Sequence, residues 1–389
     1  MYRLTHLTNP SRYLAPAWLP GGHAQTIYPA TCIVKPPVAY RRERWRAPDG
    51  DFIDVDFLDG QADKPFVVLF HGLEGSSASH YARALMSHVA ALGWSGAVPH
   101  FRGCSGQMND GPRFYHSGDA AEIDWVLRKL AARRGLGPDA VHTPFASLVN
   151  SDIIKSSSWS NGGNGDGSRN SYSDGSDIAS SGGGGDSSTN RKLGNSSSNS
   201  NSKFYAAGVS LGGNALLRWV GESQHQAGFV DAACAISAPL DLAAGGAALS
   251  RGLNMLYTRV FLRTLKPKCL QKLAQFPGLF DSTSMLNARN LYEFDNIVTA
   301  PLHGYRNTDD YWNRASARHI LGDVTVPTLV LNARNDPFLP QQHLPQSAAA
   351  QITLEYPQQG GHVGFVSGRP PGALDWLPHR MVDFLEGRG

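Results

Sequence analysis

Short, continuous apolar runs alternate along the chain with segments whose apolar residues recur every three or four positions. Such runs predict strands buried on both faces, and the longer periodic segments predict helices with one apolar face. The predicted strands cover residues 66–70, 94–99, 203–209, 230–237, 326–333 and 352–356. The predicted helices cover residues 81–92, 119–134, 214–220 and 374–385. Strand and helix in regular alternation predict an α/β fold with a mostly parallel central sheet and helices on both faces.

Two segments near the N-terminus do not follow this alternation. Residues 41–46 and 52–58 flank the turn residues Pro48-Asp49-Gly50, and this pattern predicts an antiparallel hairpin. Residues 14–27 are rich in proline and glycine, so we expect an irregular loop there.

Two longer segments interrupt the predicted sheet. Residues 145–202 consist mainly of Ser, Gly, Asn and Asp, a composition that predicts a low-complexity, disordered insertion because it cannot bury enough apolar surface. Residues 243–321 have a mostly helical pattern and are too long for a simple crossover, so they predict a helical cap between two strands. With these two additions, residues 1–389 are expected to form a single domain.

Composition narrows the function classes. The chain has 389 residues, 41% of them apolar, and a net charge of +3 from 35 basic and 32 acidic residues. A balance this even argues against nucleic-acid binding. The four cysteines are far apart and predict neither a zinc site nor a disulfide framework. With no secretory signal pattern and no apolar run of membrane-spanning length, we expect a cytoplasmic protein.

The segment Gly208-Val209-Ser210-Leu211-Gly212 is the one Gly-x-Ser-x-Gly sequence in the chain. It joins a predicted strand to a predicted helix, which is the context of a nucleophile elbow. Ser210 would then lie at the apex of a strained turn, and the glycines on either side would allow neighbouring backbone to approach closely. The backbone N–H of Leu211 would face the oxyanion of an attacked carbonyl.

A serine nucleophile needs a base and an acid that orients the base. Asp336 and His362 each follow a predicted strand and come after Ser210 in the order Ser, Asp, His that serine hydrolases of this fold use. The glycine-rich turn after the strand 66–70 is the expected source of a second oxyanion donor, the N–H of Leu73.

Other residues compete for these roles. Asp241 also follows a strand, and we prefer Asp336 because it follows the penultimate strand. His319 and His343 have helical or polar surroundings and are expected at the surface, whereas His362 stands between glycines. His23 is expected to satisfy backbone groups of its own loop rather than to line a pocket.

Seven segments resemble the YheT-like α/β-hydrolase family, whose eukaryotic relatives include membrane-associated lipid esterases. They are Pro16–Thr26, Phe70–Ser76, Gly208–Asn214, Tyr292–Asp295, His303–Tyr305, Asn335–Phe338 and Gly360–Phe365. The resemblance spans nearly the whole chain, and residues 145–202 depart from the family pattern. It implies a serine esterase that acts on carboxylic esters of short or medium acyl chains, with Ser210, Asp336 and His362 as its triad.

Three hypotheses follow. The first is a serine carboxylester hydrolase, with a small-molecule ester as substrate and no cofactor or metal. The second is an acyltransferase of the same fold, in which an alcohol replaces water, and the third is a non-catalytic scaffold. Peripheral contact with a membrane is compatible with the sequence, which does not indicate an oligomeric state.

Overall fold

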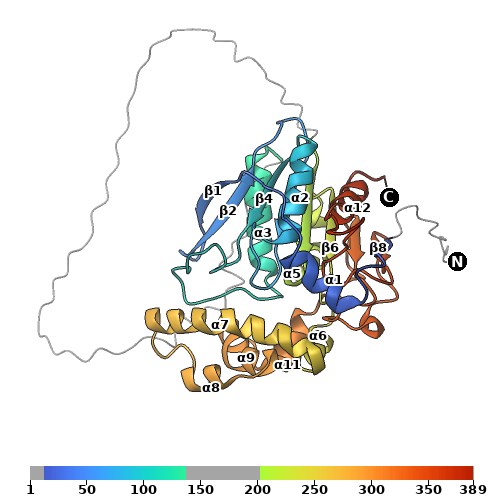
Figure 1. Cartoon of the computed structure of the whole chain (residues 1–389). Coiled ribbons are helices and arrows are strands. Elements are labelled where there is room, and N and C mark those ends of the chain that lie inside the picture. The colour runs from blue at the N-terminus through green and yellow to red at the C-terminus, as the bar shows by residue number, and fades with distance from the viewer. Residues whose placement is uncertain (1–12, 137–201, 389) are drawn as a thin grey trace, which may run out of the picture. The chain divides into compact units, whose positions relative to one another are not determined.

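The computed structural model describes residues 13–136 and 202–388, which contain a sheet of eight strands in the order β1-β2-β4-β3-β5-β6-β7-β8 (Figure 1). The strands are β1 (Arg41–Arg46), β2 (Phe52–Leu58), β3 (Phe66–Phe70), β4 (Ser95–Pro99), β5 (Phe204–Val209), β6 (Ala232–Ile236), β7 (Thr328–Leu331) and β8 (Ile352–Glu355). Strands β3 to β8 are parallel to one another, while β2 is antiparallel to β1 and β4. The predicted hairpin and the mostly parallel sheet are therefore confirmed.

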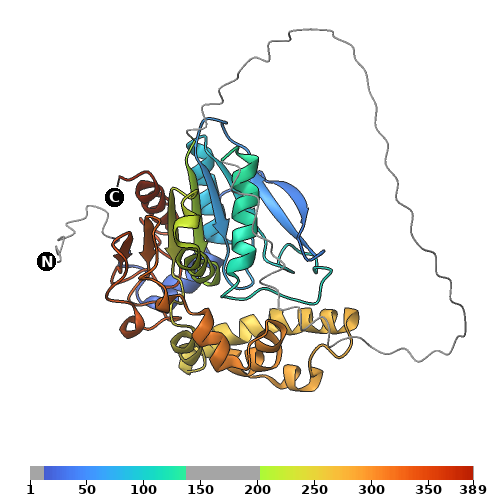
Figure 2. The same ribbon diagram turned by 180° about the vertical axis from the view of Figure 1, so that it is seen from behind.

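Alternate residues of the central strands pack on two separate cores. On one face, Val68 and Ala206 contact residues of α3 (Ala120–Arg133) and α5 (Leu211–Ser223). On the other face, Val67 and Leu69 contact residues of α2 (His80–Ala91) and α12 (Trp376–Leu385). Figure 1 shows α2 and α12 in front of the sheet, and Figure 2, the view from behind, shows α3 and α5 on the opposite face. Burial on both faces explains why these strands have continuous apolar runs.

The stretch between β6 and β7 forms a group of helices at the lower end of the sheet in Figure 1. They are α6 (Leu242–Leu249), α7 (Met255–Gln275), α8 (Ser282–Asn287), α9 (Leu291–Phe294), a π-helical turn (Asp295–Thr299), α10 (Ala300–Leu302) and α11 (Thr308–Ala315). They have a small core of their own, which includes Leu262, Met285 and Phe294. Asp241 begins α6 by accepting a hydrogen bond from the N–H of Ala244.

The expectation of an irregular loop over residues 14–27 is wrong in its second half. Residues Gly22–Thr31 form helix α1 despite Pro29 within it. Gly22 is required here because a Cβ atom at this position would lie 1.9 Å from the carbonyl oxygen of Asn335. Gly22 therefore marks a close packing contact rather than an absence of regular structure.

The predicted insertion at residues 145–202 lies, apart from Ser202, outside the described residues. Among the helices of the described ranges, none combines the length and the apolar character that crossing a membrane requires.

Candidate active site

Ser210 stands at the turn between β5 and α5. Its φ angle of 53° is strained for a residue with a side chain. A Cβ atom at Gly208 would lie 2.4 Å from the carbonyl oxygen of Gly212, and one at Gly212 would lie 2.4 Å from that of His71. Strand β5, the turn and the start of α5 can come this close only because both positions are glycine. The packing presents the Ser210 side chain at the end of the sheet.

The structure brings the three predicted triad residues together. The Nε2 atom of His362 lies 2.9 Å from Oγ of Ser210, and its Nδ1 atom lies 2.8 Å from Oδ2 of Asp336. A carboxylate only accepts, so Nδ1–H donates to Asp336 and Nε2 is left to accept the serine proton. Asp336 is buried, and its Oδ1 also accepts the N–H of Phe338 at 2.7 Å.

Two further contacts hold His362, one at its imidazole and one at its backbone. The ring of Phe338 stacks on it, with centroids 4.0 Å apart and planes inclined by 16°. The backbone N–H of His362 donates to Oγ1 of Thr26 in α1 at 2.8 Å. Phe338, after β7, therefore positions the ring, and Thr26 in α1 positions the backbone that carries it.

Helix α1 also supports the loop that presents His362. Oε1 of Gln25 accepts from the N–H of Gly360 at 2.9 Å and from Nδ2 of Asn335 at 2.9 Å. Oδ1 of Asn335 in turn accepts the N–H of Gly361 at 3.0 Å. The sequence pattern predicted an irregular loop in this region and gave no role to Gln25. The sequence contains no local signal for this role, because Gly360 lies 335 positions after Gln25.

The turn after β3 is held by a buried histidine. His71 is fully enclosed, and desolvation lowers its pKa to about 3, so the ring is neutral. Its Nε2 accepts the N–H of Phe101 at 3.0 Å, and its Nδ1 therefore donates to the carbonyl of Gly72 at 2.8 Å. This arrangement fixes the backbone immediately before Leu73.

Glu74, directly after Leu73, is the centre of a polar cluster. Its φ angle is 55°, and its N–H donates to the hydroxyl of Tyr115 at 2.8 Å. Its Oε1 accepts from that hydroxyl at 2.9 Å and from Nζ of Lys268 in α7 at 2.8 Å. An ion pair therefore links the turn after β3 to the helices between β6 and β7.

Leu73 and Leu211, the predicted oxyanion donors, line the same pocket as Ser210. Leu211 is the first residue of α5, so its N–H has no acceptor earlier in that helix. Within the described ranges, the N–H of Leu73 makes no intramolecular hydrogen bond. Both groups are therefore available to an oxygen atom next to Ser210.

The pocket lies between the sheet and the helices that follow β6. It holds about 1060 Å³ of space between atoms, part of which is open to solvent. Its walls are largely apolar; the apolar side chains from the helices include Leu249, Phe261, Leu265, Leu291, Phe294, Val298 and Trp312. Asp295 is a polar exception, and desolvation raises its pKa to about 6, against hydrogen bonds from Thr299 and Trp312 that favour the charged form.

The competing residues lie elsewhere. Asp241 pairs with Arg318 and lies 3.6 Å from Nδ1 of His343, with no contact to His362. His319 and His343 are exposed, as expected. Nδ1 of His23 lies 3.1 Å from the hydroxyl of Tyr257 in α7, so this histidine contacts another helix rather than its own backbone.

Known proteins resemble this chain in sequence. No protein-family model matches the chain. The Escherichia coli (strain K12) protein named "Putative esterase YheT" is 31% identical over 370 residues, which cover 93% of this chain and 89% of that protein. The chain belongs to the YheT-like α/β-hydrolase family.

This YheT-like hydrolase is also similar to proteins of lower sequence identity. Phospholipase ABHD3 of Mus musculus is 25% identical over 96% of this chain and 78% of its own length. Among solved structures, the Pyrococcus furiosus esterase Pf2001 matches with a TM-score of 0.45 and 14% identity, over 91% of this chain and 99% of its own. The predicted α/β-hydrolase fold and the class of carboxylic ester hydrolase are confirmed.

Proposed function

We propose that this YheT-like hydrolase is a serine carboxylester hydrolase that cleaves short- to medium-chain acyl esters through an acyl-serine intermediate. The observation that carries the proposal is the continuous hydrogen-bonded series from Asp336 through His362 to Ser210, with distances of 2.8 and 2.9 Å. A serine hydroxyl becomes a useful nucleophile at neutral pH only when such a base accepts its proton.

The first half of the reaction forms the intermediate. Oγ of Ser210 attacks the ester carbonyl carbon while Nε2 of His362 takes the hydroxyl proton, and Asp336 stabilises the resulting imidazolium. The carbonyl electron pair moves to its oxygen, which accepts hydrogen bonds from the N–H groups of Leu73 and Leu211. When this tetrahedral species collapses, the bond to the alcohol breaks and His362 returns the proton to the departing oxygen.

Water completes the cycle. It attacks the acyl group on Ser210 with His362 again as the base, and collapse of the second tetrahedral species releases the carboxylic acid and free serine. Each oxyanion donor contributes on the order of 3 kcal/mol to lowering the barrier.

The acyl chain would occupy the apolar pocket beside Ser210. Helices α6 to α11 then act as a cap that sets the chain length, because they supply most of the apolar wall. All four cysteines are free thiols, which supports a reducing, cytoplasmic location.

A series of p-nitrophenyl esters of increasing chain length tests the proposal on wild type and Ser210→Ala. We expect a preference below about twelve carbons and a loss of at least roughly a thousandfold in kcat/KM in the variant. Wild type should also be labelled by a fluorophosphonate probe, and Ser210→Ala should not. Undiminished turnover by the variant, or equal labelling of both proteins, would reject Ser210 as the nucleophile.

A further inference from the structure

Helix α7 and the turn before it carry an exposed stripe of mostly apolar residues. Its members recur at alternating intervals of three and four positions: Leu253, Leu256, Val260, Arg263, Pro267 and Leu270. That spacing places them on one side of a helix. The exposed fractions of Leu253, Leu256 and Val260 are 66%, 52% and 62%, and that of Leu270 is 44%. We call these six residues the α7 outer stripe.

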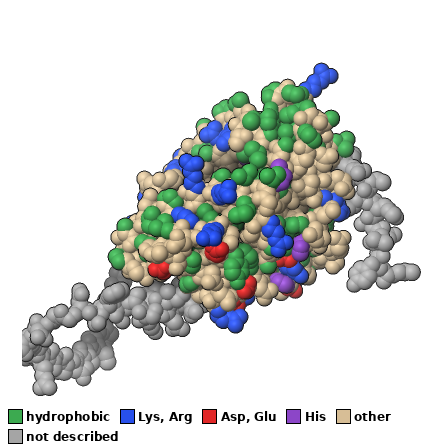
Figure 3. Space-filling model, turned by 60° about the horizontal axis from the view of Figure 1, so that its bottom comes forward, with side chains coloured by type: hydrophobic (Ala, Val, Ile, Leu, Met, Phe, Trp, Pro, Cys, Tyr) green, Lys and Arg blue, Asp and Glu red, His purple; other side chains and the backbone are tan. Residues whose placement is uncertain are grey.

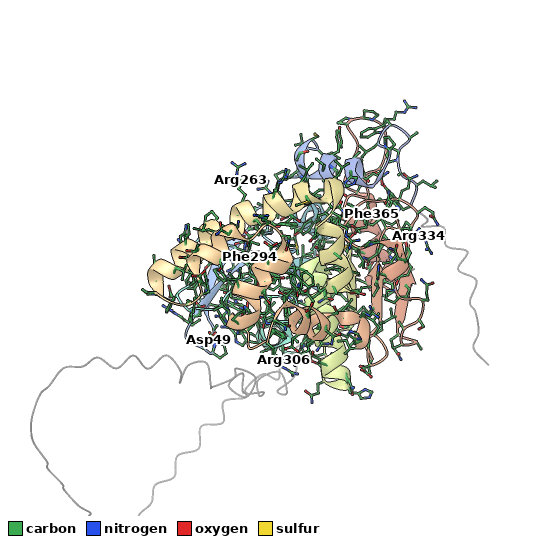
Figure 4. All side chains as sticks on the ribbon, turned by 90° about the horizontal axis from the view of Figure 1, so that it is seen from below. Asp49, Arg263, Phe294, Arg306, Arg334 and Phe365 are labelled. Atoms are coloured by element: carbon green, nitrogen blue, oxygen red, sulfur yellow. The ribbon has the colours of Figure 1, made fainter. Side chains whose placement is uncertain are left out.

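The exposure of the α7 outer stripe is additional to the contacts that α7 makes with the rest of the protein. Leu262 and Cys269 are buried on its inner side, and Phe261 and Leu265 line the pocket beside Ser210. The helix is therefore apolar on two sides, although packing requires only one. Figure 4 shows Arg263 pointing from α7 away from the other helices. An apolar surface of this extent on a helix is typical of an interaction site.

Charge distinguishes among the partners that could cover the stripe. The segment from Leu242 to Phe280 contains no Asp or Glu and six basic residues: Arg251, Arg259, Arg263, Lys266, Lys268 and Lys272. Lys268 and Lys272 turn inward, to Glu74 and to the carbonyls of Asn109 and Gly111. The three arginines are exposed. The face seen in Figure 3 likewise has basic side chains among apolar ones and few acidic ones.

A second copy of this chain is a poor match, because pairing two such stripes would bring arginines of equal charge together. The surface of a bilayer that contains anionic lipid offers both complements. Its phosphates attract arginine, and the boundary between headgroups and acyl chains accepts leucine and valine.

We infer that the α7 outer stripe, with Arg251 and Arg259 beside it, docks the protein on an anionic lipid bilayer. In that position the opposite side of the same helix still forms the wall of the pocket, so the bilayer surface and the pocket are separated by the thickness of one helix. The inference rests on the proposed function only for its purpose, which is access to esters dissolved in the membrane. The docking itself requires no catalysis.

Sedimentation of the full chain with vesicles tests the inference directly. We expect binding to phosphatidylcholine vesicles that contain about 30% phosphatidylglycerol, weakening as salt is added, and far less binding to phosphatidylcholine alone. The triple variant Leu253→Glu/Leu256→Glu/Val260→Glu should bind at least about tenfold more weakly. The double variant Arg259→Gln/Arg263→Gln should lose about thirtyfold in affinity for the anionic vesicles.

Leu92→Glu is the matched control, because Leu92 is an exposed leucine (36%) at the C-terminal cap of α2, outside α7. It should bind vesicles as wild type does. The two α7 variants and Leu92→Glu should keep the wild-type Tm, which verifies that they are folded, and should turn over water-soluble p-nitrophenyl acetate at the wild-type rate. Ser210→Ala should bind vesicles fully, so failure of the esterase proposal would leave this test intact.

Three results would overturn the inference. They are equal vesicle binding by wild type and both α7 variants, equal binding to neutral and anionic vesicles, and a stable dimer in light scattering that the triple variant dissociates. The last result would assign the stripe to a second copy of the chain.

Discussion

The sheet and the helices between β6 and β7 bury their apolar residues to very different degrees. Every residue of β3, β5 and β6 is buried, whereas α7 leaves a line of leucine and valine side chains in contact with solvent. The sheet region carries the serine, the histidine and the aspartate on turns at strand ends, held by glycine contacts and buried hydrogen bonds. The helical region supplies most of the pocket wall. Burial of the sheet region therefore holds the three predicted catalytic side chains in positions that must be exact to a few tenths of an ångström. The helical region, which is less buried, can vary in the ligands that its pocket wall accepts.

The two regions are joined at a few polar contacts. Nδ2 of Asn214 in α5 donates to the carbonyl of Ala315 at 2.8 Å, and its Oδ1 accepts the N–H of Ala317 at 3.0 Å. A second connection is the ion pair between Glu74 and Lys268, beside the pocket. Substitutions within each region and at the ion pair between Glu74 and Lys268 should therefore have separable effects.

The largest effect should come from the sheet region, in Asp336→Asn. The amide can still contact His362 but cannot hold the same tautomer or stabilise the imidazolium, so kcat should fall about ten-thousandfold with little change in Tm. Asp241→Asn is the control, because Asp241 pairs with Arg318 and only caps α6. It should keep its activity. The opposite result, with Asp241→Asn inactive and Asp336→Asn active, would show that the acid was assigned wrongly.

Gly212→Ala should disrupt the sheet region through a steric clash. A Cβ atom there would lie 2.4 and 2.5 Å from the carbonyl oxygens of His71 and Phe70. These are backbone atoms, which can move little to relieve the clash. The free energy of unfolding should fall by about 2 to 4 kcal/mol in chemical denaturation, with activity lost in parallel. Gly322→Ala has no atom within 4 Å of the new Cβ and should change stability by less than about 0.5 kcal/mol. Equal stabilities for the two variants would contradict the close approach.

Lys268→Met tests the ion pair that connects the two regions. Glu74 would lose its cationic partner but keep Tyr115, so the turn that carries Leu73 should be less well held and kcat should fall about tenfold, with a smaller change in KM. Glu74→Gln keeps an acceptor for Tyr115 and removes the ion pair, so it should match Lys268→Met. A loss as large as that of Asp336→Asn would instead place Lys268 in the chemistry.

The smallest effect should appear within the helical region, at Asp295. Burial raises its pKa from 3.8 to about 6, so between these pH values the folded state binds a proton that the unfolded state has lost. The contribution of this group to stability therefore falls as pH rises from about 4 to about 6. Asp295→Asn cannot titrate, so its stability relative to wild type should rise by about 1 kcal/mol between about pH 5 and about pH 6. Parallel pH profiles of the two proteins would refute the raised pKa.

Much of the sheet region was predictable from local pattern. Apolar runs located the strands because strands buried on both faces admit few polar residues, as in Phe66–Phe70. The turn around Ser210 was predictable because only glycine tolerates the contacts at positions 208 and 212. The order of Ser210, Asp336 and His362 followed from the same reasoning, and their catalytic roles stay predictions.

Helix α1 and the cluster around Glu74 were not predictable in this way. Gln25 and Thr26 matter because they contact residues more than 300 positions later in the chain, and no local periodicity reports such a contact. Glu74 and Lys268 are separated by 194 positions, and either one alone resembles an ordinary surface charge.

The amino-acid sequence alone determined which segments are strands, where the backbone must turn sharply, and which three side chains could form a nucleophile with its base and acid. These properties follow from steric and solvation preferences of neighbouring residues. The tertiary structure alone decided the distances between those side chains, the pairing of Glu74 with Lys268, and which side of α7 faces the pocket and which faces solvent. These depend on how distant segments pack, and a helix that is apolar on two sides contains no local signal for which of them will be covered.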